Sequence, residues 1–403
     1  MTIEIDSSTS AVLAAPSAAE VRATLEQAWS LEVPLTDLPP VSSAARLSAL
    51  QALISHNDSL DAMLVTNLDN IRALSGFAGS SARLLVSSDT AFLLTDARYE
   101  ERAAEELSAS GSVIDVVVRR NQSDQQAWLR EHVVASGHAR VGLEAASLSW
   151  ADHDALVADA PAVNWVAVTN PVERLRRTKS LGEIARTARA ASIADAALAQ
   201  VVPMLSGAVT ERAFQRALDS AMITLGADAV SFDTIVASGP NASRPHHETG
   251  ARVIVEGDEV ICDFGALVDG YHSDMTRTIY VGEPSKAQQR HFAVVRAAHD
   301  EAAAAITPGI SCVALDRIAR DVCEAAGWGD RFVHGLGHGT GLVIHELPWL
   351  GTTSRNAICD GDLVTIEPGV YLPGSGGVRI EDLYVVTTDG PIALTRAPVD
   401  IVV

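Results

Sequence analysis

The chain has 403 residues, more than one hydrophobic core usually supports, so we expect two domains. Its composition is that of a soluble globular protein, with 47% hydrophobic and 20% charged residues, and its formal net charge is −21. Such a charge repels phosphate backbones and anionic lipid surfaces, which argues against a nucleic acid or a membrane as the partner.

Residues 1–44 are interpreted as a leader that is partly disordered. Its start, Met1–Glu20, lacks the positive charges of a secretory signal, and Pro16 interrupts the apolar stretch Ala11–Ala15. No apolar run in the sequence reaches the length of about 18 residues that a membrane span requires. We therefore expect a cytoplasmic protein.

Residues 45–170 alternate short apolar runs, at 62–65, 82–86 and 91–94, with helical stretches such as 99–109. This alternation predicts an N-terminal α/β domain. The segment 171–180, PVERLRRTKS, is basic and polar, and we interpret it as a linker.

A second domain is expected over residues 181–403. Ser180 and Glu183 form an S-x-x-E capping box, which predicts a long helix at its start. Within this domain, 203–228 and 307–330 each place a capped amphipathic helix between two glycines. This weak repetition supports a pseudo-symmetric domain.

The segment Glu259–Val281 is predicted to form a β-hairpin with its turn at residues 268–270. If the turn is formed by Val268 and Asp269, Asp263 is directly opposite Asp274. If it is shifted by one residue, Asp274 lies opposite Gly265 and still shares a face with Asp263. Two close carboxylates repel each other, so either register predicts a bound proton or metal ion between them.

A histidine-rich loop follows in HGLGHGTGLVIHE, where His334, His338 and His345 lie among four glycines. Glycine lets the backbone approach a ligand closely, and imidazole is both a metal ligand and an acid or base near neutral pH. This combination predicts a functional site.

Two further acids, Glu367 and Glu381, lie in apolar strand-like runs separated by the turn-rich segment 372–377. Both share a face in a hairpin with an odd-length loop or a bulge near Gly374. Ionised glutamates are costly in apolar surroundings unless cations balance them, and Arg379 supplies one positive charge for two acids. The pattern therefore predicts additional cations.

These motifs resemble the pita-bread metallopeptidases, a family that includes methionine aminopeptidase, prolidase and Xaa-Pro aminopeptidase. The resemblance covers nearly the whole chain and implies an α/β fold, with an N-terminal creatinase-like domain before a pseudo-symmetric pita-bread catalytic domain. The family's catalytic histidines fall on His246, in GPNASRPHH, and on His345, in VIHE, and its Xaa-Pro branch adds His334 and Arg379. Its five metal ligands fall on residues of the motifs DFG, SDMTRT, GLGHGTG, IEPG and RIED, namely Asp263, Asp274, His338, Glu367 and Glu381.

The resemblance implies hydrolysis of the bond before proline with two divalent metal ions. Four carboxylates among five ligands suit Mn²⁺, our first expectation, or Co²⁺, with Zn²⁺ and Fe²⁺ as alternatives. Glu367 is the expected proton shuttle, while His345 and His246 are expected to bind the substrate and stabilise developing charge. His334 is expected to shape the proline pocket and Arg379 to orient carboxylates without binding metal. Relatives commonly form homodimers, and we expect one here.

The N-terminal segments DNIRALSGFAGSSARLLV and LTDARYEERAAEE resemble the extra domain of bacterial Xaa-Pro peptidases, which methionine aminopeptidases lack. We therefore expect a Xaa-Pro aminopeptidase acting on proline-containing peptides, with prolidase, restricted to Xaa-Pro dipeptides, as the alternative. A metal-free hydrolase like creatinase and a non-catalytic binding protein are two alternatives from other classes. Both normally lose metal ligands, so the intact set argues against them.

Overall fold

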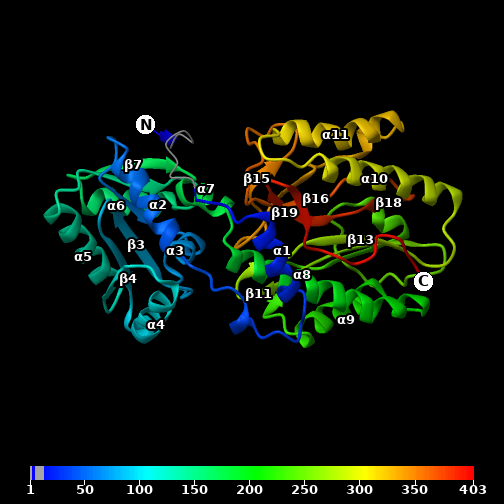
Figure 1. Cartoon of the computed structure of the whole chain (residues 1–403), viewed down its shortest axis with the longest axis horizontal. Helices are drawn as coiled ribbons and strands as arrows, with labels where there is room; N and C mark the ends of the chain where they lie inside the picture. The colour runs from blue at the N-terminus through cyan, green and yellow to red at the C-terminus, as the bar shows by residue number, and fades with distance from the viewer. Residues whose placement is uncertain (1, 5–12) are drawn as a thin grey trace. The chain divides into compact units, whose positions relative to one another are not determined.

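A computed structural model describes residues 2–4 and 13–403, and the chain forms two compact units (Figure 1). The first unit contains the described residues up to 14 and residues 40–176, and the second contains residues 15–39 and 177–403. Among the described helices, none combines the length and the apolar character that crossing a bilayer requires.

The first unit is built on a mixed seven-stranded sheet. Its strands are β1 (Thr2–Glu4), β2 (Ala62–Val65), β3 (Ala82–Ser87), β4 (Ala91–Thr95), β5 (Asp115–Val118), β6 (Arg140–Glu144) and β7 (Asn164–Thr169), in the order β1-β7-β6-β2-β3-β4-β5. Its helices are α2 (Ala44–Ser55), α3 (Leu68–Ser75), α4 (Glu100–Ser110), α5 (Gln122–Ala135) and α6 (Trp150–Asp159). Leu129 of α5 and Leu156 of α6 are buried with Leu64 and Leu85 of the strands, so these two helices cover one face of the sheet. The predicted α/β pattern is confirmed.

The stretches interpreted as a partly disordered leader and as a linker both contain a helix. In the leader, α1 (Ala18–Ala28) begins with a capping box between Ser17 and Glu20, and its apolar face is buried in the second unit. The predicted linker contains α7 (Pro171–Arg177), which starts with proline, a residue well suited to the first helical position. The ordered part of the leader therefore includes 18–28, and the leader residues 1 and 5–12 lie outside the described residues.

The second unit consists of helices packed on short sheets. After α1 its helices are α8 (Leu181–Val201), α9 (Glu211–Thr224), α10 (Lys286–Ala304) and α11 (Cys312–Ala325). Its strands are β8 (Ala229–Val230), β9 (Ile235–Ser238), β10 (Glu259–Phe264), β11 (Ala266–Val268), β12 (Tyr271–His272), β13 (Met275–Tyr280), β14 (Gly337–Gly339), β15 (Glu346–Leu350), β16 (Leu363–Ile366), β17 (Gly369–Leu372), β18 (Gly376–Arg379), β19 (Asp382–Thr387), β20 (Gly390–Ala393) and β21 (Ile401–Val402).

The strands and helices of this unit fall into two similar halves. In one half, α8 and α9 pack on the sheet β21-β13-β10-β9 through residues such as Phe214 and Val260. In the other half, α10 and α11, which lie side by side in Figure 1, pack on the sheet β15-β14-β16-β19-β20 through residues such as Leu315 and Val364. The two helices of the predicted repetition are α9 and α11, each capped by a hydroxyl side chain. The pseudo-symmetric architecture is confirmed.

Candidate active site

Asp263 and Asp274 lie on the predicted hairpin, in the second of the two registers that we considered. The turn residues are Asp269 and Gly270, both with positive φ, and the alternative turn formed by Val268 and Asp269 is wrong. The physical reason is steric, because a β-branched residue is strained at positive φ whereas Asp and Gly tolerate it. Asp263 lies in β10, Asp274 immediately precedes β13, and both side chains line one cavity.

His338 lies in β14 with a glycine on each side. A Cβ atom at Gly337 or Gly339 would lie 2.1 Å from a backbone carbonyl oxygen, so glycine permits the close strand packing here. His338 Nδ1 is 3.0 Å from the carbonyl oxygen of Gly339, which can only accept, so Nδ1 carries the proton. The unprotonated Nε2 is left 3.5 Å from Asp274 Oδ2 and 3.7 Å from Glu367 Oε1, as a metal ligand would be.

Glu367 and Glu381 lie where one strand pairing ends and the next begins. The pairing of β16 with β19 continues in the same register into that of β17 with β18, across a three-residue turn at 373–375. The predicted odd-length loop is therefore confirmed. Glu381 Oε2 accepts a hydrogen bond from Thr276 Oγ1 at 2.8 Å, and the backbone N–H of Glu381 donates to the carbonyl oxygen of Thr276 at 3.1 Å.

The four acids are gathered in surroundings that oppose their ionisation. Burial and neighbouring carboxylates raise the pKa values of Asp274 and Glu367 well above their ordinary range. Burial, together with Asp263, raises the pKa of Glu381 to about 8. Arg379 Nη2 donates to Asp263 Oδ2 at 2.7 Å and balances one charge. The remaining acids need protons or metal cations near neutral pH.

The donor set fits a divalent metal ion. Asp274, His338 and Glu381 are buried, and each offers one ligand atom within 4.8 Å of the others. Carboxylate oxygen and imidazole nitrogen together suit borderline divalent cations. Asp263 and Glu367 line the same cavity of about 960 Å³, so the structure brings all five predicted ligands together.

The predicted histidines outside the ligand set also line this cavity. His246 lies in the loop before β10, and its neighbour His247 is turned to Glu211, with Nε2 3.0 Å from Oε2. The ring centroid of His345 is 4.4 Å from that of His338. Their placement agrees with the predicted roles, which stay predictions.

His334 is held by a residue that the sequence analysis missed. Its Nδ1 donates to the carbonyl oxygen of Gly335 at 2.8 Å, which leaves Nε2 to accept from the hydroxyl of Tyr371 at 2.9 Å. The Tyr371 oxygen in turn accepts from Arg379 Nη1 at 2.8 Å. Thr276 and Tyr371 thus support the site. The sequence offered a signal for Thr276 alone, because strand alternation places it on the same face as Asp274.

Four acids and a histidine that line one cavity, three of these residues buried, are characteristic of metal-dependent hydrolases. Residues 185–388 match the profile of metallopeptidase family M24, and residues 46–178 match the creatinase/prolidase N-terminal domain. The chain belongs to metallopeptidase family M24 and carries the creatinase-type domain before its catalytic domain. Membership of this family implies a divalent metal ion.

Several relatives match along most of their length. An uncharacterised peptidase of Bacillus subtilis is 37% identical over 353 residues, covering 85% of this chain and 96% of that protein. A Xaa-Pro dipeptidase of Pyrococcus horikoshii is 32% identical, covering 84% of this chain and 93% of that protein.

Two solved structures also match most of the chain. A Xaa-Pro dipeptidase from Bacillus anthracis has a TM-score of 0.84 and 33% identity, covering 89% of this chain and 99% of that one. An X-Pro aminopeptidase from Thermotoga maritima has a TM-score of 0.79 and 32% identity, with the same coverage of both chains.

Proposed function

We propose that this chain is a Xaa-Pro dipeptidase that binds two divalent metal ions, with Mn²⁺ as the first candidate and Co²⁺, Zn²⁺ or Fe²⁺ as alternatives. The observation that carries the proposal is the cluster of proposed ligands on one cavity: Asp263, Asp274, His338, Glu367 and Glu381. Relatives named as Xaa-Pro dipeptidases support the substrate class, and they favour a dipeptidase over the aminopeptidase that the N-terminal segments suggested.

The side chains around the cavity suit hydrolysis of the bond before proline. When bound, the metal ions supply a water molecule of lowered pKa and stabilise the negative charge that develops on the attacked carbonyl. Glu367 lines the cavity beside His338, which places its carboxylate to accept a proton from the attacking water and to pass it to the departing proline nitrogen. Burial lowers the pKa of His345, so its neutral imidazole donates a hydrogen bond to the substrate carbonyl together with His246.

His334 and Arg379 have different tasks. Both ring nitrogens of His334 are engaged within the protein, so His334 offers its ring as a wall of the proline pocket. Arg379 donates to Asp263, a proposed ligand, and to Thr276 Oγ1, which itself donates to the proposed ligand Glu381. Arg379 therefore orients the side chains of Asp263 and Thr276.

An aminopeptidase that trims longer Xaa-Pro peptides is the second candidate. A cavity of about 960 Å³ lies at the upper end of the roughly 300–1,000 Å³ typical of small-molecule sites, which leaves room for a third residue. The likeness to the Thermotoga maritima aminopeptidase also favours this activity.

A comparison of peptide lengths tests the proposal. The Mn²⁺-loaded protein is expected to hydrolyse a Xaa-Pro dipeptide, to leave Xaa-Pro-Yaa intact and to spare the matching Xaa-Ala dipeptide. Product release is measured by chromatography, with the Glu381→Gln variant purified in parallel to exclude a contaminating peptidase. Cleavage of Xaa-Pro-Yaa at a comparable kcat/KM would establish the aminopeptidase instead.

Tyr371→Phe tests the support of His334 and Arg379. Loss of the hydroxyl removes the oxygen that joins the two side chains, so we expect kcat/KM for Xaa-Pro to fall about 10-fold to 100-fold. The free energy of unfolding should fall by about 1–3 kcal/mol, because buried polar groups lose a partner. Kinetics and chemical denaturation measure the two effects, and an unchanged kcat/KM would contradict the expected role.

A further inference from the structure

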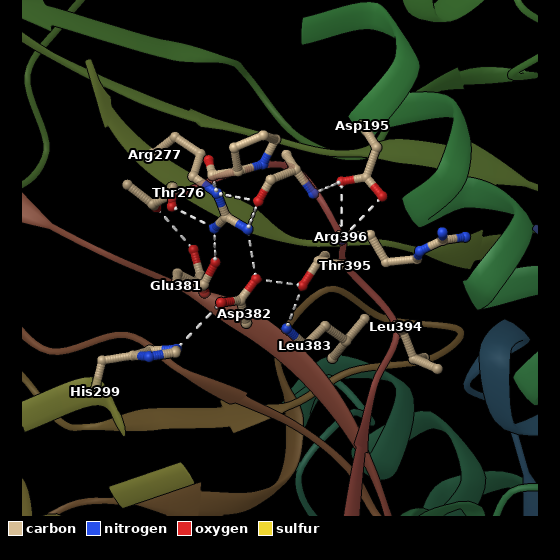
Figure 2. A network of polar contacts seen from close by, with 12 residues as sticks. Asp195, Thr276, Arg277, His299, Glu381, Asp382, Leu383, Leu394, Thr395 and Arg396 are labelled. Carbon is tan, nitrogen blue, oxygen red and sulfur yellow. Dashed lines mark hydrogen bonds and ion pairs between the residues drawn. The ribbon is translucent and has the colours of Figure 1, made fainter. Parts of the chain in front are cut away.

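Arg277 is a buried arginine that the proposed mechanism does not use. It lies in β13, is 1% exposed, and its guanidinium joins three segments of the second unit (Figure 2). Nη1 donates to the carbonyl oxygens of Glu381 at 2.6 Å and Thr276 at 3.0 Å. Nη2 donates to Asp382 Oδ1 at 2.6 Å, and Nε donates to the carbonyl oxygen of Ala397 at 3.1 Å. The fork-shaped guanidinium is suited to such bridging.

Asp382 anchors this arginine from the other side. Its Oδ1 also accepts from Thr395 Oγ1 at 2.6 Å, and its Oδ2 lies 3.2 Å from His299 Nε2 on α10 (Figure 2). Because successive side chains of a strand point to opposite faces, Asp382 points away from the cavity that the neighbouring Glu381 lines. The Arg277–Asp382 pair therefore lies behind the proposed metal site.

The network extends from α10 in one half of the second unit to α8 in the other half. The segment that carries Ala397 is held on its second side by Asp195 of α8, whose carboxylate accepts the backbone N–H groups of Arg396 and Ala397 at 2.9 and 2.8 Å (Figure 2). Arg277 is thus tied to α8 through this segment and to α10 through Asp382 and His299. Both halves of the second unit fix its position.

We propose that Arg277, anchored by Asp382, is a positioning residue for the proposed metal site. It holds the main chain at Glu381 and at Thr276, the residue whose hydroxyl donates to the Glu381 carboxylate. A ligand set must be held within about 0.5 Å of its working geometry, and partners that orient ligands commonly change metal affinity 10-fold to 100-fold. This inference rests on the proposed function, because Glu381 is a proposed ligand.

A double substitution separates positioning from simple stability. Arg277→Met with Asp382→Leu removes both buried charges, so neither charge is left buried without its partner. The carbonyl oxygens of Glu381 and Ala397 lose a donor, so we expect the metal-free double variant to melt below the wild type. We also expect its affinity for Mn²⁺, measured by isothermal titration calorimetry, to be about 10-fold to 100-fold weaker. Arg277→Lys serves as a second variant, because the ammonium still pairs with Asp382 but lacks the fork, and it should also bind Mn²⁺ more weakly.

Arg177 provides the matched control. It forms a buried pair with Asp362 in the same unit, with Nε 2.9 Å from Oδ1, so Arg177→Gln should lower stability and leave the Mn²⁺ affinity unchanged. Wild-type affinity for Mn²⁺ in both Arg277 variants would overturn the inference, as would an equal loss of affinity in Arg177→Gln. If the wild-type protein itself binds no Mn²⁺, the proposed Mn²⁺ site fails first and the inference falls with it.

Discussion

Removal of divalent metal ions with a chelator is expected to abolish peptide hydrolysis and to lower the melting temperature. The fall in melting temperature should be larger at about pH 8 than at about pH 5. In the metal-free chain, burial raises the pKa of Glu381 from 4.5 to about 8 and raises those of Asp274 and Glu367 well above their ordinary range. Between the ordinary pKa of 4.5 and the raised pKa of about 8, Glu381 holds a proton in the folded chain that the unfolded chain has released. Stability of the metal-free chain therefore falls as the pH rises through this window.

Bound metal replaces these protons, so its stabilising effect grows over the same pH range. Mn²⁺ at about 100 times its dissociation constant stabilises the fold by about 2.7 kcal/mol, which corresponds to roughly 5–10 °C in melting temperature. Scanning calorimetry of metal-free and Mn²⁺-loaded protein at about pH 5 and about pH 8 measures both effects. Equal shifts at the two pH values, or full activity of the chelated protein, would contradict the prediction.

Glu367→Gln is expected to lower kcat for Xaa-Pro hydrolysis about 100-fold to 10,000-fold, the range usual for loss of a general acid or base. The same substitution should raise the melting temperature of the metal-free chain at neutral pH. The reason is that it removes a carboxylate whose ionisation is opposed by burial and by Glu381. Activity and metal-free stability are thus expected to change in opposite directions.

Steady-state kinetics and calorimetry of the chelated variant measure these two quantities. The control is Glu301→Gln, which makes the same chemical change at an exposed position of α10 and should alter neither. A Glu367→Gln protein that keeps a tenth of the wild-type kcat, or that melts below the wild type without metal, would refute the assignment of Glu367.

Local rules predicted much of the site. Alternation along the strands and the parity of the turns placed Asp263 with Asp274 and Glu367 with Glu381, because these pairs lie within single hairpins. That both pairs meet His338 on one cavity depends on tertiary packing, and it was expected from the family resemblance.

Features held by distant partners escaped prediction. Arg277 donates a hydrogen bond to Ala397, which lies 120 residues further along the chain, and a local sequence pattern cannot predict such a bond. The helix α1 was missed although Ser17 and Glu20 carry the S-x-x-E signal, because the apolar surface that buries it belongs to α8 and to strands near the C-terminus.

The placement of α1 also sets an order of assembly. Its buried face packs on Ile184 and Leu383, so its partners leave the ribosome only after the entire first unit has been made. Domains generally fold as units while the chain grows, so the apolar face of α1 stays exposed until α8 has been synthesised. An isolated fragment starting at residue 177 would uncover the matching surface, and a recombinant catalytic unit should therefore carry residues 15–39 as a tethered segment.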